Sequence, residues 1–264
     1  MKSLAKLTEA VVVIAKDAGA FIRAQSQSFS SEMTEHKGLH DLVSHVDRTA
    51  EDMILSALAK LLPEAGFIAE ESGSKTAEEF NWIVDPLDGT TNFVHGVPIY
   101  SVSIALKQND RIVLGVVYEI SRDECFYAWR ESQAFLNGKA IATSPAKTLA
   151  DSLIATGFPY NDFSRMEGYL RLFDDLMRNS RGLRRLGSAA VDLAYVACGR
   201  FEAFYEYGLN PWDVAAGAFI VQQAGGRVTD FKQSNNWLFG KEICASNRLT
   251  HDEMIAKINT YLLK

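Results

Sequence analysis

The stretch at residues 82–98, which reads WIVDPLDGTTNFVHGVP, constrains this chain more than any other. A β-branched run leads to Asp85, and Pro86 then stops any helix and removes a backbone donor, so we expect a strand to end at Asp85. A second carboxylate follows at Asp88, before a glycine that permits a tight turn and two threonines whose hydroxyls lie beside exposed N–H groups. The stretch therefore contains part of the ligand set of a metal site and part of a phosphate-binding turn.

Two carboxylates so close in the sequence have two explanations. They repel each other unless one is protonated or a cation lies between them, and a ligand set made only of oxygen favours a hard ion such as Mg²⁺. The same letters, DPLDG, also describe an ordinary turn in which an aspartate caps the next element. The remainder of the chain decides between these interpretations.

Length and composition exclude several classes of protein. With 264 residues, 47% of them hydrophobic, the chain can form one domain, 1–264, made of two packed halves at about 1–145 and 146–264. The net charge of −6 predicts no nucleic-acid partner. It would also repel an anionic substrate, so such a substrate would need bound cations.

The N-terminal segment and the cysteines indicate a cytoplasmic protein. The apolar run at 11–15 is short and is followed by Lys16 and Asp17, so it predicts an amphipathic helix and not a signal peptide. No stretch of the sequence approaches the length needed to span a membrane. The three cysteines lie far apart among apolar or aromatic neighbours, which is typical of buried thiols in a reducing compartment.

Three further segments place acids where an element begins or ends. Asp47 lies in the first turn of an expected helix, Glu70 follows a short apolar strand, and Asp213 lies in the first turn of a helix introduced by an Asn-Pro pair. Each acid also has a structural explanation, which is helix capping for the two aspartates and a solvated strand end for the glutamate. If the strands before Glu70 and Asp85 are neighbours, their ends converge.

The remaining pattern predicts a mixed α/β fold. Residues 99–142 alternate as in an antiparallel meander, whereas the second half of the chain alternates strands and helices. In that half we expect a helix over 162–178. Near the C-terminus, Thr250 and Glu253 predict a capping box for the last helix.

Acids lie at the ends of four separate segments. A shared site explains this pattern better than four unrelated structural roles do. The motifs that contain them, or accompany them, are DLVSHVD (41–47), AEES (69–72), WIVDPLDGTTNF (82–93), GSAAVDLAYVACG (187–199) and NPWDVAAGAFIVQQAGG (210–226). Taken together, they resemble the inositol monophosphatase family of Mg²⁺-dependent, lithium-sensitive phosphatases over essentially the whole chain. The resemblance implies a homodimer with the layered α-β-α-β-α sandwich of the sugar-phosphatase type, an α/β fold with mixed and antiparallel sheets.

The resemblance also implies a site with two or three Mg²⁺ ions. The first ion would be bound by Glu70, Asp85 and the carbonyl of Leu87. The second would be bound by Asp85, Asp88 and Asp213. A third, weaker ion would lie near Glu70 and be held largely by water.

Catalytic roles are implied for Asp47, Glu70 and Thr90. The hydroxyl of Thr90, oriented by Asp47, would position the attacking water, and the N–H groups of Gly89 and Thr90 would bind the phosphate. The substrate would contact Asp88, Ala189, Glu206 and Asp213. Of these, Glu206 is also explained as a charge at a strand edge.

We therefore expect Mg²⁺-dependent hydrolysis of a small phosphate monoester, with myo-inositol 1-phosphate as the first candidate. Phosphoryl transfer needs in-line geometry and charge stabilisation more than a nucleophilic side chain, and the sequence contains no GxSxG, Walker or GxGxxG motif. However, the segment TGFPY (156–160) lacks the small polar residues that some inositol-specialised members place near the sugar.

Other substrates stay open within the same chemistry. Relatives cleave fructose 1,6-bisphosphate, histidinol phosphate or the 3′-phosphate of adenosine 3′,5′-bisphosphate, and a bisphosphate needs extra cationic groups. Arg184 and Arg185 are candidates for binding a second phosphate or for surface ion pairs. A regulatory partner-binding protein that retains the fold is the alternative from another class. The intact metal set favours an enzyme, because buried unpaired carboxylates are costly when no metal binds.

Overall fold

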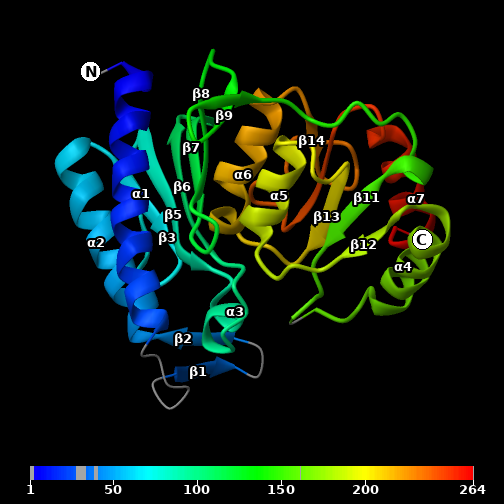
Figure 1. Ribbon diagram of the computed structural model, residues 1–264, viewed down its shortest axis with the longest axis horizontal. Helices are drawn as coiled ribbons and strands as arrows, with labels where there is room; N and C mark the ends of the chain where they lie inside the picture. Colours follow the sequence, from blue (N-terminus) through cyan, green and yellow to red (C-terminus); the bar gives the residue numbers. More distant parts are fainter. Residues whose placement is uncertain (1–2, 28–33, 39–40, 161, 264) are drawn as a thin grey trace.

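Helices and β-sheets alternate in five layers, in the order α-β-α-β-α (Figure 1). The computed structural model describes residues 3–27, 34–38, 41–160 and 162–263. The layer order and the mixed strand directions confirm the expected α/β sandwich.

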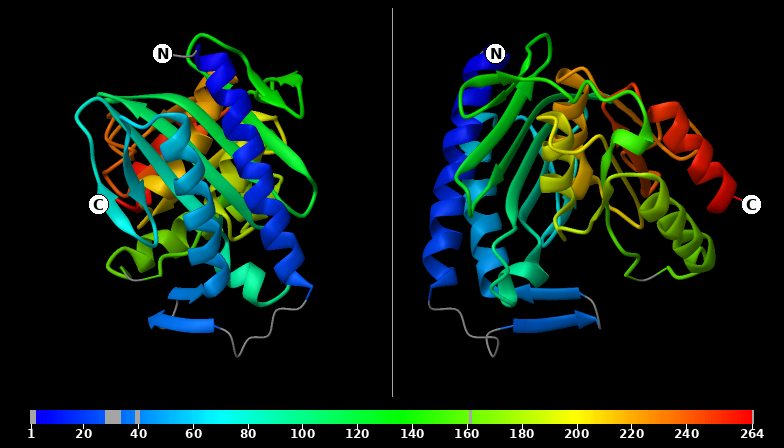
Figure 2. Two further views of the ribbon diagram at one scale, coloured as in Figure 1. Left: turned by 90° about the vertical axis from the view of Figure 1, so that its left-hand side faces the viewer. Right: turned by 45° about the vertical axis from the view of Figure 1, so that its right-hand side comes forward.

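The first two layers are a helix pair and an eight-stranded sheet. Helices α1 (Leu4–Ser26) and α2 (His45–Leu61) cover one face of the sheet, as Figure 2 shows. The sheet has the order β10-β9-β8-β7-β6-β5-β3-β4, and its neighbouring strands are antiparallel except for the pair β3 and β5. Its strands are β3 (Gly66–Ala69), β4 (Gly73–Lys75), β5 (Phe80–Asp88), β6 (Ser101–Gln108), β7 (Arg111–Glu119), β8 (Glu124–Trp129), β9 (Ala134–Leu136) and β10 (Lys139–Ile141).

Side-chain alternation along β5 explains why this sheet is covered on both faces. Trp82 and Val84 pack in the core under α1 and α2, while Ile83 belongs to the core on the opposite side. That opposite side is covered by helices α5 (Ala189–Ala197) and α6 (Pro211–Gln223). All of α5 is buried, as expected for a helix that is apolar nearly all round and lies between two sheets.

The second sheet lies beyond α5 and α6 and has the order β12-β11-β13-β15-β14. Its strands are β11 (Leu153–Thr156), β12 (Gly182–Arg184), β13 (Ala203–Tyr207), β14 (Arg227–Thr229) and β15 (Glu242–Ser246). Its outer face is covered by α4 (Met166–Asn179) and α7 (His251–Tyr261). Shorter elements are the antiparallel hairpin β1 (Thr34–Gly38) and β2 (Asp41–Ser44), the helix α3 (Thr90–Val94) and the 3₁₀ turn η2 (Leu149–Asp151).

Strand β5 does not end at Asp85, so that expectation is wrong. The strand continues through Pro86 to Asp88, and its register with β6 shifts between Asp85 and Asp88. A bulge is one of the few places where a strand tolerates proline, because a bulged residue does not need to donate to the ladder. Because the strand continues through the bulge, Asp85 and Asp88 both lie on β5.

Two helix starts also differ from expectation. Helix α4 begins at Met166, four residues later than the predicted start. The predicted capping box of α7 is wrong, because the Thr250 hydroxyl donates to Asn247 Oδ1 and Glu253 Oε2 accepts a hydrogen bond from the N–H of Leu149, 2.9 Å away. Both capping groups are thus used in tertiary contacts.

No helix in the described part of the chain combines the length and the apolar character needed to cross a membrane. The three cysteines are free thiols, and two of them are buried.

Candidate functional site

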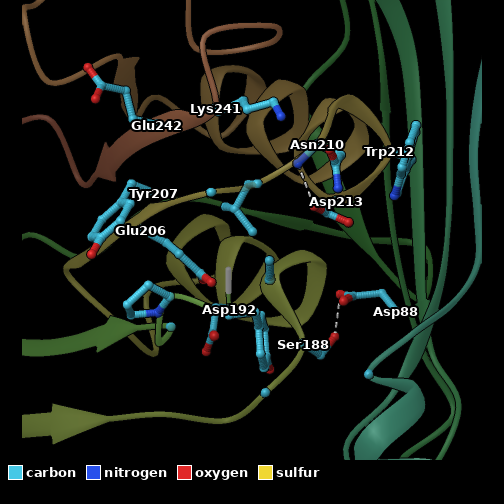
Figure 3. Close-up of a pocket in the computed structure, with 18 of the residues that line it drawn as sticks. Asp88, Ser188, Asp192, Glu206, Tyr207, Asn210, Trp212, Asp213, Lys241 and Glu242 are labelled. Carbon is cyan, nitrogen blue, oxygen red and sulfur yellow. Dashed lines mark hydrogen bonds between the residues drawn. The ribbon is translucent and has the colours of Figure 1, made fainter. Parts of the chain in front are cut away.

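A cavity of about 540 Å³ opens between the end of β5, the N-termini of α5 and α6, and the end of β13 (Figure 3). Seven of the expected site residues line it: Glu70, Asp88, Gly89, Thr90, Ala189, Glu206 and Asp213. The other three, Asp47, Asp85 and Leu87, are buried: Asp47 and Leu87 accept hydrogen bonds from the Thr90 hydroxyl, and Asp85 accepts one from the N–H of Leu87. The structure therefore brings all ten residues together.

The pairing of β3 with β5 explains how Glu70 reaches Asp85. The two strands are parallel neighbours, with Ala69 opposite Val84, so the residues that follow lie at the same edge of the sheet. The N–H of Glu70 extends this pairing by donating to the carbonyl oxygen of Val84. The expected convergence of these two strand ends is confirmed.

The carboxyls at this edge have raised pKa values. Burial is the first cause for Glu70, Asp85 and Asp213, and repulsion from neighbouring carboxylates adds to it. Burial also raises the pKa of Asp88 to about 6, although hydrogen bonds from Ser188 and from the backbone oppose that shift. Asp85 and Glu70 lie close enough that each affects the pKa of the other.

These acids fit a hard divalent cation. They supply only oxygen ligands, which suit Mg²⁺, and repelling buried carboxylates need either protons or a cation. Among the described residues, however, no three His, Cys, Asp or Glu side chains are yet arranged as a metal site. The fit to the ion therefore rests on the oxygen chemistry of these donors.

A short hydrogen-bonded chain lies beside the acids. The hydroxyl of Thr90 lies 2.9 Å from Asp47 Oδ1 and 3.0 Å from the carbonyl oxygen of Leu87. Because a hydroxyl has one proton and two acceptor lone pairs, Thr90 can donate to Asp47 and still accept a hydrogen bond from a water. Asp47 is 1% exposed, so its carboxylate holds Thr90 from inside the fold.

Gly89 sets up the turn before Thr90. Its φ of +98° is accessible to glycine but strained for other residues, and a Cβ would also lie 3.0 Å from the carbonyl oxygen of Ile99. Helix α3 starts immediately after it, and the first N–H groups of a helix have no acceptor within that helix. The expected phosphate-binding N–H groups therefore lie at a turn that only glycine allows.

Asp88 and Asp213 each bond the start of a helix. Asp88 Oδ2 accepts hydrogen bonds from Ser188 Oγ at 2.6 Å and from the N–H of Ala190 at 2.7 Å (Figure 3). Asp213 Oδ2 accepts one from the N–H of Asn210, also at 2.6 Å. The capping explanation for Asp213 is thus correct in geometry, and it leaves the second oxygen of the carboxylate for another role.

Glu51 is a site residue that the sequence analysis missed. It is buried on α2, and its two oxygens accept hydrogen bonds from the N–H groups of Glu71 and Ser72, at 2.9 and 2.8 Å. These bonds fix the turn that carries Glu70. The available signal was an acid four residues after Asp47, on the same helix face and beside the buried Ala50.

The two adjacent arginines, which could not be separated by sequence, have different surroundings. Arg185 lines the cavity, whereas Arg184 is exposed and donates to the carbonyl oxygen of Leu183. Glu206 also lines the cavity, and burial raises the pKa of Glu206 to about 8 although the charge of Arg185 lowers it. Glu206 is only 6% exposed, so it is not a solvated charge at a strand edge.

Comparisons with known proteins agree with this arrangement. The family model described as the inositol monophosphatase family matches residues 3–263. The Nus factor SuhB of Pseudomonas aeruginosa is 41% identical over 254 residues, with 94% of both chains covered. The inositol-1-monophosphatase of Mesorhizobium japonicum is 38% identical over 254 residues, with 96% of both chains covered.

A solved structure extends the likeness to three dimensions. The crystal structure of the extragenic suppressor protein suhB from Bartonella henselae has a TM-score of 0.90 at 40% identity, covering 96% of this chain and 98% of that one. The match runs over the whole chain in sequence and in structure. The protein belongs to the inositol monophosphatase family.

Proposed function

We propose that this protein hydrolyses small phosphate monoesters with Mg²⁺. One observation carries the proposal: four acids, the buried Asp85 and the half-buried Glu70, Asp88 and Asp213, meet beside the hydrogen-bonded pair of Asp47 and Thr90. Members of the family use Mg²⁺. An acidic site binds a phosphate only when cations intervene, which explains why a chain of negative net charge takes an anionic substrate.

The acids divide into two proposed ligand sets. Glu70, Asp85 and the carbonyl of Leu87 form the first set, and Asp85, Asp88 and Asp213 form the second. A third ion near Glu70 would be held largely by water. When bound, Mg²⁺ activates water and neutralises charge on the phosphate and on the leaving alkoxide.

The remaining groups orient the reactants. Thr90 donates its hydroxyl proton to Asp47 and accepts a hydrogen bond from the attacking water, which fixes the direction of attack. The N–H groups of Gly89 and Thr90 hold the phosphate, so that the water, the phosphorus and the leaving oxygen lie in line. No covalent intermediate on the protein is needed.

The first substrate candidate is myo-inositol 1-phosphate. The alcohol part of the ester would lie in the cavity, which is lined by Asp88, Ala189, Glu206 and Asp213. A relative 38% identical to this chain is named inositol-1-monophosphatase. Fructose 1,6-bisphosphate, histidinol phosphate and adenosine 3′,5′-bisphosphate are the alternatives with the same mechanism.

Phosphate release by the purified protein tests the proposal. We expect Mg²⁺-dependent turnover with the highest kcat/KM for myo-inositol 1-phosphate among the four substrates. Activity that persists in EDTA contradicts the mechanism. A preference for another ester keeps the mechanism and changes the substrate.

A relative's name supports a second candidate function. The 41% identical protein of Pseudomonas aeruginosa is called a Nus factor, so we propose that this chain also acts by binding a macromolecular partner. The variant Asp88→Asn separates the two functions, because a pure binding role survives the loss of one carboxylate. If Asp88→Asn abolishes the protein's effect in the cell together with its phosphatase activity, partner binding is not needed to explain that effect.

Two further properties are proposed from the resemblance. Lithium inhibits the enzyme by competing at the second ligand set, and the protein forms a homodimer in solution. Inhibition curves at several Mg²⁺ concentrations test the first property, and light scattering coupled to gel filtration tests the second.

A further inference from the structure

Asn92 joins two segments of the site that lie far apart in the sequence. It is the third residue of α3, directly after the turn at Gly89 and Thr90, and it is 9% exposed. Its amide nitrogen donates to the carbonyl oxygen of Leu186, 94 residues away, and to that of Ile99, each at 2.8 Å. Because both neighbours are acceptors, the amide nitrogen and not the amide oxygen faces them. One NH₂ group thus uses both of its protons to hold this turn against the segment that leads into α5.

The same two segments are also joined at their other end. Ser188 Oγ donates to Asp88 Oδ2 at 2.6 Å (Figure 3), so one contact lies on each side of the turn. The two contacts differ in kind, because Asp88 lines the cavity and Asn92 does not. A substrate in the cavity does not touch Asn92, so any effect of this residue on the reaction is transmitted through the segments that it joins.

Two glycines allow the segments to lie this close together. A Cβ at Gly187 would come within 2.9 Å of Asn92 Nδ2, and a Cβ at Gly89 would lie 3.2 Å from the carbonyl oxygen of Gly187. Closely packed segments of this kind adjust little when one side chain changes. The two hydrogen bonds of Asn92 therefore cannot be replaced by tighter packing of the same segments.

We propose that Asn92 is a positioning residue for phosphoryl transfer, because it fixes the phosphate-binding turn relative to the start of α5. The turn carries the N–H groups of Gly89 and Thr90, whereas α5 begins at Ala189, which lines the part of the cavity proposed for the leaving alcohol. In-line transfer needs the phosphate and the leaving oxygen to be aligned, and a shift of about 1 Å can lower the rate about 100-fold. This inference rests on the proposed function and adds to it a residue outside the cavity.

The variant Asn92→Leu tests the assignment, since it removes both donors and keeps the branched shape of the side chain. For the ester that the wild type hydrolyses best, we expect kcat to fall by about 10-fold or more and KM to change less, because alignment matters most in the transition state. Hydrogen–deuterium exchange is a second readout. It is expected to become faster at residues 186–190, which lose one of their two contacts to the turn.

Asn247 provides a matched control. It is 3% exposed, and its amide nitrogen also donates to two carbonyl oxygens, those of Ser144 and Ala146, at 3.0 and 2.7 Å. It does not line the cavity. Asn247→Leu therefore removes the same kind of double contact at another place in the fold. We expect it to lower the unfolding free energy, and to leave both kcat and the exchange at residues 186–190 as in the wild type.

Asn92→Ser replaces Asn92→Leu if that variant does not fold. Its hydroxyl has one proton and cannot serve both carbonyls, so the same changes are expected. A lower kcat together with faster exchange, neither of them seen in Asn247→Leu, supports the inference. If kcat or the exchange in the folded Asn92 variant equals the wild-type value, the positioning role is overturned and the phosphatase assignment stands. If the wild type hydrolyses no ester, the proposed function fails and this inference fails with it.

Discussion

At the scale of single residues, Asp88 both stabilises the start of a helix and is a proposed metal ligand. One of its oxygens accepts two hydrogen bonds at the start of α5, so its removal would disturb the helix as well as the site. Replacement by Asn keeps an acceptor oxygen and the shape of the side chain, and removes the charge. We expect Asp88→Asn to lower kcat/KM by at least about 100-fold, as when one electrostatic contact to a transition state is lost.

Steady-state phosphate release measures this effect. Asp174→Asn makes the same chemical change at an exposed position and serves as the control. A fall in kcat/KM of less than about threefold would remove Asp88 from the proposed second ligand set.

Thr90 allows a test of the hydroxyl itself. Thr90→Val keeps the shape and removes the group that bonds Asp47, so we expect kcat to fall by about 100-fold, the lower range for a positioned proton-transfer group. Thr90→Ser restores the hydroxyl and is expected to recover most of the activity. A kcat of Thr90→Val close to that of the wild type would contradict the proposed role of the hydroxyl, and a loss in Thr90→Ser alone would show that only packing of the methyl group matters.

At the scale of elements, Glu51 connects α2 to the turn after β3. Its two oxygens accept two backbone N–H groups, which become unpaired in Glu51→Ala. We expect this variant to lose about 1–3 kcal/mol of unfolding free energy, and to need more Mg²⁺ for half-maximal activity because the turn that carries Glu70 loosens. Urea denaturation measures the loss of stability, and Mg²⁺ titration of the activity measures the Mg²⁺ requirement. An unchanged Mg²⁺ requirement would show that Glu51 does not position Glu70.

The start of α7 gives a prediction about pH. His251 is buried between Ser246 and Thr229, and burial lowers its pKa from 6.5 to about 4. The unfolded chain therefore binds a proton at higher pH than the folded chain, so this residue's contribution to stability is lost as pH falls from about 6.5 to 4. The loss is at most about 3 kcal/mol.

Comparison with His251→Gln isolates this contribution. The variant is expected to lose less stability than the wild type between pH 6.5 and pH 4, as followed by denaturant unfolding at each pH. If the wild type and the variant lose the same unfolding free energy over this pH range, His251 is not held neutral in the folded state.

Element boundaries show where sequence patterns fail. The longer helices and most of the longer strands were predicted in type because apolar periodicity reports burial on one face or on two, whereas the short elements β2, β4 and α3 were not predicted. Their ends depend on tertiary partners that no local pattern contains. Thus Thr250 bonds Asn247 and does not cap α7, and Pro86 lies within a bulge and does not end β5.

At the scale of the whole molecule, the carboxyl cluster couples folding to metal. Burial raises the pKa of Asp88 to about 6, and the pKa values of Glu70, Asp85 and Asp213 are raised in the same direction. The folded chain therefore holds protons that the unfolded chain releases above about pH 4. Without metal, stability from these groups is lost as pH rises through 4 to 6 and beyond.

Mg²⁺ is expected to reverse this loss, because a ligand that binds only the folded state stabilises it. The increase in Tm on adding Mg²⁺ should grow as pH rises from 5 to 7. Scanning calorimetry with and without Mg²⁺ at each pH measures it, and the effect of His251 cancels in the difference. A Tm increase that does not depend on pH would show that metal does not replace these protons.

The site was predictable to the extent that its residues lie in motifs. Acids after strands and at helix starts indicated a cluster, and the parallel pairing of β3 with β5 brings Glu70 to Asp85. Support from distant segments was not predictable, since the sequence does not show which helix will deliver a partner. Glu51 is an example, because its role depends on which turn α2 faces.

The shared duties of Asp88 and Asp213 have a consequence for genetics. Both side chains hold the N-terminus of a buried helix with one oxygen, so an alanine allele at either position removes a helix contact along with the charge of a proposed metal ligand. Failure of such an allele to complement a deletion would not show that catalysis is essential, because reduced protein abundance predicts the same phenotype. Asparagine alleles, with protein levels measured beside growth, are the informative separation-of-function alleles for this chain.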